Sequence, residues 1–166
     1  MLVLHPVDSF GYSDNLEASL RRMGVLDETW RERRFFAGDR LMRHIAFVGC
    51  MPSLRLRPEG EKPFVYIELP AVSDAPLFRF GRERPPRCAD CGNPVDWGNI
   101  SDEAATCRRC GRETSLSALR WPSRAACLAR QVALIHGIHR GDAAPTEAFL
   151  EQLGKETGVG WDYCFL

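Results

Sequence analysis

The sequence CADCGNPVDWGNISDEAATCRRCG, residues 88–111, contains two Cys-x-x-Cys-Gly units in a chain with seven cysteines. Two residues between the cysteines of a pair let one tight turn direct both sulfurs toward a single ion. Gly92 and Gly111 follow the pairs and let the backbone fold back, so that amide N–H groups face the sulfurs. The linking segment is long enough for a short hairpin that brings the two pairs together. The predicted ligands of one zinc ion per chain are Cys88, Cys91, Cys107 and Cys110.

Four thiolates fill the tetrahedral coordination of zinc and leave no position for substrate or water, so we predict a structural ion. The ion would supply folding energy that a segment of roughly forty residues cannot obtain from its own core. Three alternatives remain open. Two disulfides need an oxidising compartment, rubredoxin-type iron uses similar turns within a compact aromatic protein, and the thiols could be metal-free. Ligand type and spacing favour zinc.

The turns CADCG (88–92) and CRRCG (107–111) resemble those of the zinc ribbons. The resemblance covers residues 84–120 and implies a closed structural site. It implies no function, because zinc ribbons occur in transcription factors, ribosomal proteins, RNA-modifying enzymes and scaffolds. The stretch FFAGDRLMRHIAFVGCMPSLRL (35–56) is also similar to a segment of small uncharacterised bacterial zinc-ribbon proteins, and this likeness brings no activity with it.

Composition indicates a globular protein: the 166 residues are 45% hydrophobic and 27% charged, and their formal net charge is zero. A zero net charge gives no general attraction to nucleic acid or to anionic membranes. No apolar run reaches the length of a membrane span. The opening MLVLHPVDSF contains an acidic residue and lacks the basic segment that begins a secretory signal, so we do not expect it to be one. We therefore expect a cytoplasmic protein with reduced thiols and no membrane partner.

Sequence periodicity predicts an α+β fold: N-terminal helices, then a mixed β-sheet with a C-terminal βαβ unit, and an inserted zinc ribbon. The expected helices run from Asp14 to Gly24, from Asp27 to Gly38, from Asp39 to Gly49, and from Pro145–Thr146 to Gly154 or Gly158. The expected strands are SLRLR (53–57), FVYIEL (64–69), LFRF (77–80), QVALIHGI (131–138) and WDYCFL (161–166).

GRERPPR (81–87) has the composition of a linker, because its paired prolines exclude helix and remove ladder donors. We therefore expect residues 1–83 and 121–166 to form the main domain, and residues 84–120 to form the zinc-ribbon insertion. Whether the ribbon docks on the sheet or moves about Pro85–Pro86 is left open.

Arginines concentrate around the cysteine turns. Residues 79–124 contain nine arginines against six acids, and only Lys62 and Lys155 are lysines in the whole chain. Arginine beside an aromatic side chain suits single-stranded nucleic acid, but it also suits an acidic protein segment. Asp90, Asp96 and Glu113 dilute the charge, so an ordinary ribbon surface is an equal alternative. The candidate binding patch comprises Arg82, Arg84, Arg87, Trp97, Arg108, Arg109 and Arg112.

The other cysteines, Cys50, Cys127 and Cys164, are expected to fill the core, as free cysteines usually do. A catalytic pairing of Cys50 with His44 or His136 is a weak alternative, since a cysteine and a histidine in one chain carry little information. His5 has no partner in the sequence. No glycine-rich phosphate loop, nucleophile elbow or His-Glu-x-x-His motif is present.

These observations favour a non-catalytic binding module whose zinc ribbon contacts a macromolecular partner. The zero net charge favours another protein, or a second copy of the chain, as that partner. Binding of single-stranded RNA or DNA through the arginines is the second hypothesis. The third is an enzyme with an active site in a cleft between ribbon and sheet, away from the zinc ion.

Overall fold

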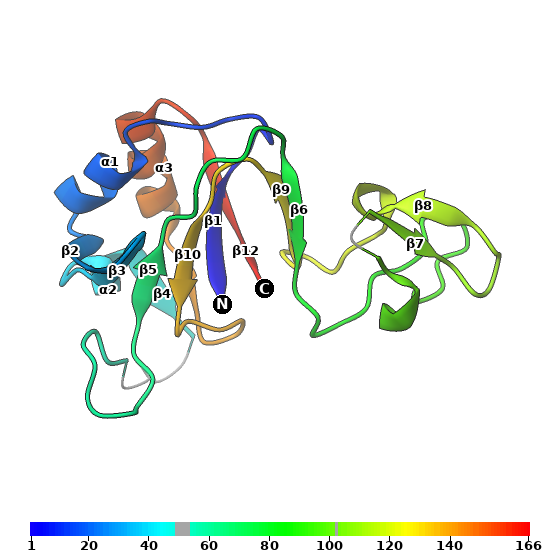
Figure 1. The fold of residues 1–166 in the computed structure, drawn as a ribbon, viewed down its shortest axis with the longest axis horizontal. Helices are drawn as coiled ribbons and strands as arrows, with labels where there is room; N and C mark the ends of the chain where they lie inside the picture. Colours follow the sequence, from blue (N-terminus) through cyan, green and yellow to red (C-terminus); the bar gives the residue numbers. More distant parts are fainter. Residues whose placement is uncertain (49–53, 102) are drawn as a thin grey trace.

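The computed structural model describes residues 1–48, 54–101 and 103–166, which adopt an α+β fold dominated by strands. A six-stranded sheet forms the centre of the molecule (Figure 1). Its strands, in spatial order, are β12 (Trp161–Phe165), β1 (Leu2–Pro6), β10 (Ala133–His136), β5 (Tyr66–Glu68), β3 (Arg34–Ala37) and β2 (Leu26–Arg31).

Three two-stranded sheets and three α-helices complete the described part of the chain. The small sheets pair β4 (Ile45–Phe47) with β11 (Ala143–Pro145), β6 (Leu77–Phe80) with β9 (Ala126–Ala129), and β7 (Ala104–Thr106) with β8 (Glu113–Ser115). The helices are α1 (Leu16–Arg22), α2 (Leu41–His44) and α3 (Glu147–Thr157). Short 3₁₀ turns, η1 and η2, lie at Trp97–Asn99 and Leu116–Ala118.

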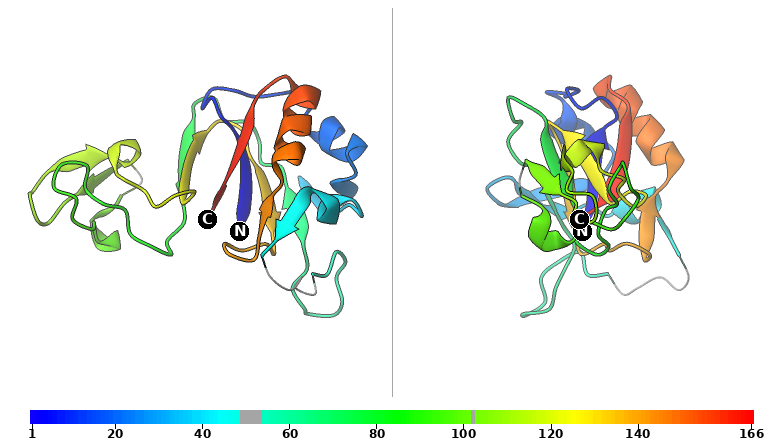
Figure 2. Two further views of the ribbon diagram at one scale, coloured as in Figure 1. Left: turned by 180° about the vertical axis from the view of Figure 1, so that it is seen from behind. Right: turned by 90° about the vertical axis from the view of Figure 1, so that its right-hand side faces the viewer.

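The elements are arranged in layers along the long axis of the molecule. Figures 1 and 2 show α1 and α3 on one side of the six-stranded sheet and the β6–β9 pair on the other. The segment that contains β7 and β8 lies beyond β6 and β9, at the end opposite the helices. The four cysteines of the two turns are therefore far from the helical layer.

Every pair of neighbouring strands in the six-stranded sheet is antiparallel, so the expectation of a mixed sheet was wrong. The reason is the first strand, which the sequence analysis did not identify. Strand β1 lies between β10 and β12 and runs antiparallel to both. Strands β10 and β12 are thus parallel to each other, with α3 in the connection between them, but β1 separates them. The C-terminal βαβ order is present in this split form.

The predictions for α1 and α3 are confirmed by the structure. Thr146 caps α3, where its hydroxyl accepts a hydrogen bond from the backbone N–H of Phe149 at 3.2 Å. Gly158 ends the helix in the left-handed conformation, with φ of 76°. The same local signals predicted both ends, and strands 77–80, 133–136 and 161–165 also lie within their predicted ranges.

The predicted helix from Asp27 to Gly38 is instead the β2–β3 hairpin. Phe35 and Ala37 are buried, whereas Arg34 and Phe36 on the opposite face are only partly buried. This alternation is the period of a strand. Hydrogen bonding of β3 to β5, which is distant in sequence, decides the outcome, and tertiary pairing of this kind overrides local propensity.

Two further predictions were also wrong. The helix expected from Asp39 to Gly49 is a single turn, α2, followed by strand β4, and Val48 of its expected apolar stripe is 72% exposed. Residues 54–57 of the expected strand 53–57 form no strand. Strand β5 already has neighbours on both edges, β3 and β10, so it offers no free edge to residues 54–57. Gly49, Cys50 and Ser53 lie outside the described residues.

The two faces of β1 contribute to different cores. Leu2 and Leu4 point toward α1 and α3 and join the main core, which includes Leu20 and Phe149. Val3 points the other way, into a smaller core that also contains Ala129 and Val132. Strand β1 is therefore covered on both sides, by helices on one face and by the β9 region on the other.

We predict that Phe149→Ala lowers the free energy of unfolding by about 3–5 kcal/mol, because the ring is 1% exposed and packs in the main core. Phe10→Ala is the matched control, since that ring is 63% exposed, and its effect should stay within about 0.5 kcal/mol. Urea denaturation of both variants provides the measurement. Equal losses for the two variants would contradict the assigned core.

Candidate metal centre

The two cysteine turns bring their four sulfurs into one cluster. All four Sγ atoms lie within 4.8 Å of one another. The distance from Cys88 Sγ to Cys110 Sγ is 3.8 Å, and the distance from Cys91 Sγ to Cys107 Sγ is 3.6 Å. Four sulfurs at about 2.3 Å from a tetrahedral zinc ion would be about 3.8 Å apart. The cluster therefore has dimensions that suit a metal ion.

The two turns have the same backbone structure. In the first, Gly92 N–H donates to Cys88 O at 3.0 Å, and Cys88 N–H donates to Asn93 O at 2.8 Å. In the second, Gly111 N–H donates to Cys107 O at 2.8 Å, and Cys107 N–H donates to Arg112 O at 2.9 Å. Gly92 and Gly111 both have φ of 70°, a conformation that favours glycine. The predicted role of both glycines is confirmed.

Short β-pairings hold each turn at its base. Arg87 pairs with Pro94 around the first turn, and Thr106 pairs with Glu113 around the second. Arg87 also pairs with Arg120, which closes the segment on itself. The first cysteine of each pair, Cys88 or Cys107, is buried, and the second is exposed. Each turn thus contributes one buried cysteine and one exposed cysteine to the cluster.

The apolar core around the cluster is small. It consists of Cys88, Val95, Ala105, Cys107, Leu116 and Leu119. Phe78, Phe80, Ile100 and Trp121 pack against it. A core of this size gives a segment of this length little stability by itself, which is the usual situation of small metal-dependent folds.

The four thiols do not lose their protons together. The Asn93 amide donates to Cys91 Sγ at 3.4 Å and lowers the pKa of Cys91 to about 6. The backbone N–H of Arg112 acts to lower the pKa of Cys110, but desolvation and hydrogen bonds with the other three thiols raise it to about 11. Further negative charge is unfavourable once the first thiolate forms. A divalent cation would remove this obstacle.

Acidic side chains neutralise part of the predicted arginine patch. Arg108 lies 3.5 Å from Asp96, and Arg112 lies 3.2 Å from Asp90. Arg87 donates to the carbonyl of Gly92 at 3.0 Å. The exposed arginines of the patch are Arg82, Arg84, Arg87, Arg108, Arg109 and Arg112.

Trp97, the aromatic member of the patch, is only partly exposed. Its ring is parallel to Phe80, with 6.0 Å between centroids, and lies 6.3 Å from Trp121. These contacts hold Trp97 at the junction between the cysteine segment and β6. Packing therefore occupies part of the ring that a stacking base would need.

The weak catalytic alternative gains no support from the described residues, and Cys50 lies outside them. His44 Nε2 lies 3.2 Å from Met23 O, and the ring lies against Phe149 with 4.7 Å between centroids. His136 stacks on Tyr66 with 4.1 Å between centroids. Each histidine packs in a different part of the fold, and within the described residues no hydrogen bond or ring contact joins the two.

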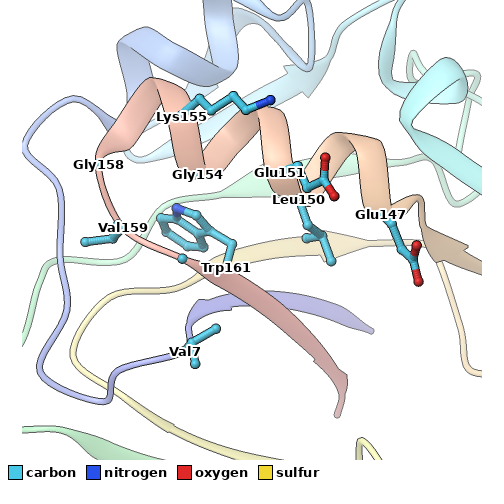
Figure 3. Close-up of a pocket in the computed structure, with 10 residues that line it drawn as sticks. Val7, Glu147, Leu150, Glu151, Gly154, Lys155, Gly158, Val159 and Trp161 are labelled. Carbon is cyan, nitrogen blue, oxygen red and sulfur yellow. The ribbon is translucent and has the colours of Figure 1, made fainter.

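A cavity between the cysteine segment and the sheet is lined by residues that include Gly81, Arg84, Pro122 and Phe165, and its volume is about 10 Å³. This space holds no more than one water molecule. A cavity of about 700 Å³ lies elsewhere, beside α3 (Figure 3). Its wall combines Glu147, Glu151 and Lys155 with apolar side chains such as Leu150 and Trp161.

A second group of ligand-type side chains was not predicted from the sequence. A ring nitrogen of His5 and the Sγ atoms of Cys127 and Cys164 lie within 4.8 Å of one another. Cys127 and Cys164 are buried, as expected, but they are not isolated core residues. The three residues are far apart in sequence and belong to three strands, so no local spacing could have revealed the group.

Comparisons with protein-family models, with curated proteins and with solved structures found no significant match to this chain. The four-cysteine geometry therefore stands on the structure alone. Among the described residues, no helix combines the length and the apolar character needed to cross a membrane.

We predict that Cys107→Ser abolishes metal binding at the four-cysteine cluster and increases hydrogen exchange of residues 104–115, because a hydroxyl is a poor substitute for a buried thiolate ligand. Metal analysis and hydrogen exchange provide the measurements. Thr106→Ser, at the exposed neighbouring residue, should change neither quantity. Unchanged exchange after complete removal of zinc would show that the segment folds without metal.

A pH dependence follows from His136, whose pKa is lowered from 6.5 by burial, although Glu68 opposes the shift. Because the unfolded state binds the proton more readily, the stability from neutral His136 is present above pH 6.5 and is lost as pH falls through the lower pKa of the folded state. As the pH falls from 7.5 to 5, we expect the free energy of unfolding to decrease more for the wild type than for His136→Gln. His139→Gln, at an exposed histidine, should follow the wild type.

Proposed function

We propose that this chain is a zinc-binding, non-catalytic binding module, in which residues 84–120 form a ribbon around one structural zinc ion. The ribbon would be inserted into a main domain made of residues 1–83 and 121–166. The observation that carries the proposal is the cluster of four sulfurs, which lie within 4.8 Å of one another, with 3.8 Å from Cys88 to Cys110 and 3.6 Å from Cys91 to Cys107. Four thiolates complete the coordination of zinc, so the ion serves the fold and not a reaction.

The charge of the ribbon supports this assignment. Four thiolates and one zinc ion carry a net charge of minus two, which is costly near an apolar core unless cations lie nearby. Arg108, Arg109 and Arg112 occupy or adjoin the second turn, and all three are exposed. These arginines would offset part of that charge, although Asp96 and Asp90 also pair with Arg108 and Arg112. Such a role would explain why arginines gather around the turns without a phosphate ligand.

A protein partner, or a second copy of the chain, fits this surface better than nucleic acid does. Asp96 and Asp90 lie against Arg108 and Arg112, and such acids repel phosphates. Apolar side chains are exposed nearby on the β6–β9 pair, where Leu77 is 49% and Leu128 is 38% exposed. A mixture of charge pairs and exposed apolar groups is typical of protein interfaces.

Site-specific photocrosslinking tests the proposal. With Arg109 replaced by p-benzoylphenylalanine, irradiation of cells should yield a protein–protein adduct, because position 109 lies in an exposed turn of the ribbon. The adduct should disappear when Cys107→Ser is added, since loss of zinc disorders the turn. The same photoreactive residue at Glu151, exposed on α3, is the positional control and should not give this adduct.

Fluorescence anisotropy with labelled single-stranded RNA tests the competing hypothesis. Phosphate binding should be strongest at low salt. At low salt we expect no RNA binding that depends on Arg108, Arg109 and Arg112. Salt-dependent binding that is lost in the triple variant Arg108→Ala, Arg109→Ala, Arg112→Ala would overturn the choice of a protein partner.

A further inference from the structure

The group formed by His5, Cys127 and Cys164 has the composition of a metal site that is separate from the four-cysteine cluster. Its three ligand atoms, one nitrogen and two sulfurs, lie within 4.8 Å of one another. Cys164 is 0% and Cys127 is 6% exposed, and His5 is partly buried. Cysteine and histidine at such distances in the interior form a set that thiophilic metal ions prefer.

Strand pairing explains how the fold assembles this group. In the β1–β12 ladder, Val3 lies opposite Cys164, and His5 lies opposite Asp162. His5 and Cys164 therefore lie on the same face of the sheet, two positions apart along the ladder. This face is directed away from the helices. Strand β9 covers that face and contributes Cys127 to the core that contains Val3 and Cys164. Three separate strands thus converge on one point.

The contacts of His5 prepare one ring nitrogen for coordination. His5 Nδ1 lies 2.9 Å from the carbonyl oxygen of Pro6. Since a carbonyl only accepts, Nδ1 carries the proton in this contact, and Nε2 retains the lone pair. A histidine that ligates a metal through one nitrogen commonly donates the other N–H to a carbonyl, which fixes the ring. The contact of Nδ1 with Pro6 O supplies the carbonyl half of that arrangement and leaves Nε2 as the nitrogen that would bind the metal.

We propose that His5, Cys127 and Cys164 bind a second thiophilic divalent ion, with zinc as the natural occupant. Two thiolates and one neutral imidazole would exactly compensate the charge of a divalent cation. A neutral complex suits its surroundings, because Val3, Ala129 and Val132 form the neighbouring core.

The protein supplies three ligands, and the fourth tetrahedral position is left for water or an external ligand. The nearest acid in the ladder is Asp162, opposite His5. Its carboxylate accepts hydrogen bonds from the guanidinium of Arg124 and from the backbone N–H of Tyr163. Both hydrogen bonds are accepted by Oδ1, and the group of ligand atoms within 4.8 Å of one another contains no oxygen of Asp162. Three protein ligands with one open position distinguish this site from the closed four-cysteine cluster.

The experiment measures metal stoichiometry in the full-length protein, reduced and then dialysed anaerobically against buffered zinc. We expect about two equivalents of zinc per chain in the wild type and about one in His5→Asn or in Cys127→Ser. His139→Asn, at an exposed histidine, should retain two. Circular dichroism will show whether each variant is folded. If Cys127→Ser does not fold, the result for His5→Asn decides.

The two metal sites can be separated in the same assay. Cys107→Ser should lose the equivalent bound at the four-cysteine cluster and retain the one that depends on His5. With cobalt in place of zinc, the remaining ion should show about half of the sulfur-to-metal absorption per ion of the four-thiolate site, because it has two thiolates instead of four.

Three results would overturn the inference without affecting the proposed function. The first is a single zinc equivalent in the wild type that depends on Cys107 and not on His5. The second is a disulfide between Cys127 and Cys164 that persists after reduction and excludes metal. Retention of two equivalents in both His5→Asn and folded Cys127→Ser would also place the second ion elsewhere.

Discussion

The pairing of β1 with β12 joins the first and last strands of the chain, and the rest of the fold depends on it. Leu2–Pro6 pairs with Trp161–Phe165 along its whole length, and β10 occupies the other edge of β1. Strand β1 therefore meets one of its two neighbours only at the end of the sequence. Formation of the sheet requires contacts of very high sequence separation, which are costly in chain entropy and slow to form.

The same pairing makes the two faces of the sheet chemically different. Alternation along β1 sends Leu2 and Leu4 toward the helices and sends Val3 and His5 toward β9. The helical face acquires a large apolar core of the ordinary kind. The opposite face acquires a small core that contains two thiols and a histidine at its edge. One ladder thus determines both the main source of stability and the position of the second group of ligands.

Features encoded by neighbouring residues could be predicted from the sequence. The cysteine turns, the cap of α3 at Thr146 and strand 77–80 depend on residues within a few positions of each other. The β2–β3 hairpin could not be predicted, because Trp30 and Phe35 fit a helical stripe as well as a strand, and β5 alone decides between them. Strand β1 and its position beside Cys127 and Cys164 result from strand pairing between distant parts of the chain, so a local sequence pattern could not predict them.

The pairing of β6 with β9 has a consequence for the cysteine segment. Phe80 lies directly opposite Ala126, and the N–H of Gly81 donates to the carbonyl of Ala125. Residues 81–125 thus leave and re-enter the body of the molecule at adjacent points, so in topology they are the greatly enlarged turn of a β-hairpin. Loop-closure entropy rises only slowly with length, so the part of this turn that has no contact with the sheet could change in size without changing the register of β6 and β9. Arg124 would have to be kept, because it binds Asp162 and its carbonyl accepts a hydrogen bond from the N–H of Phe165.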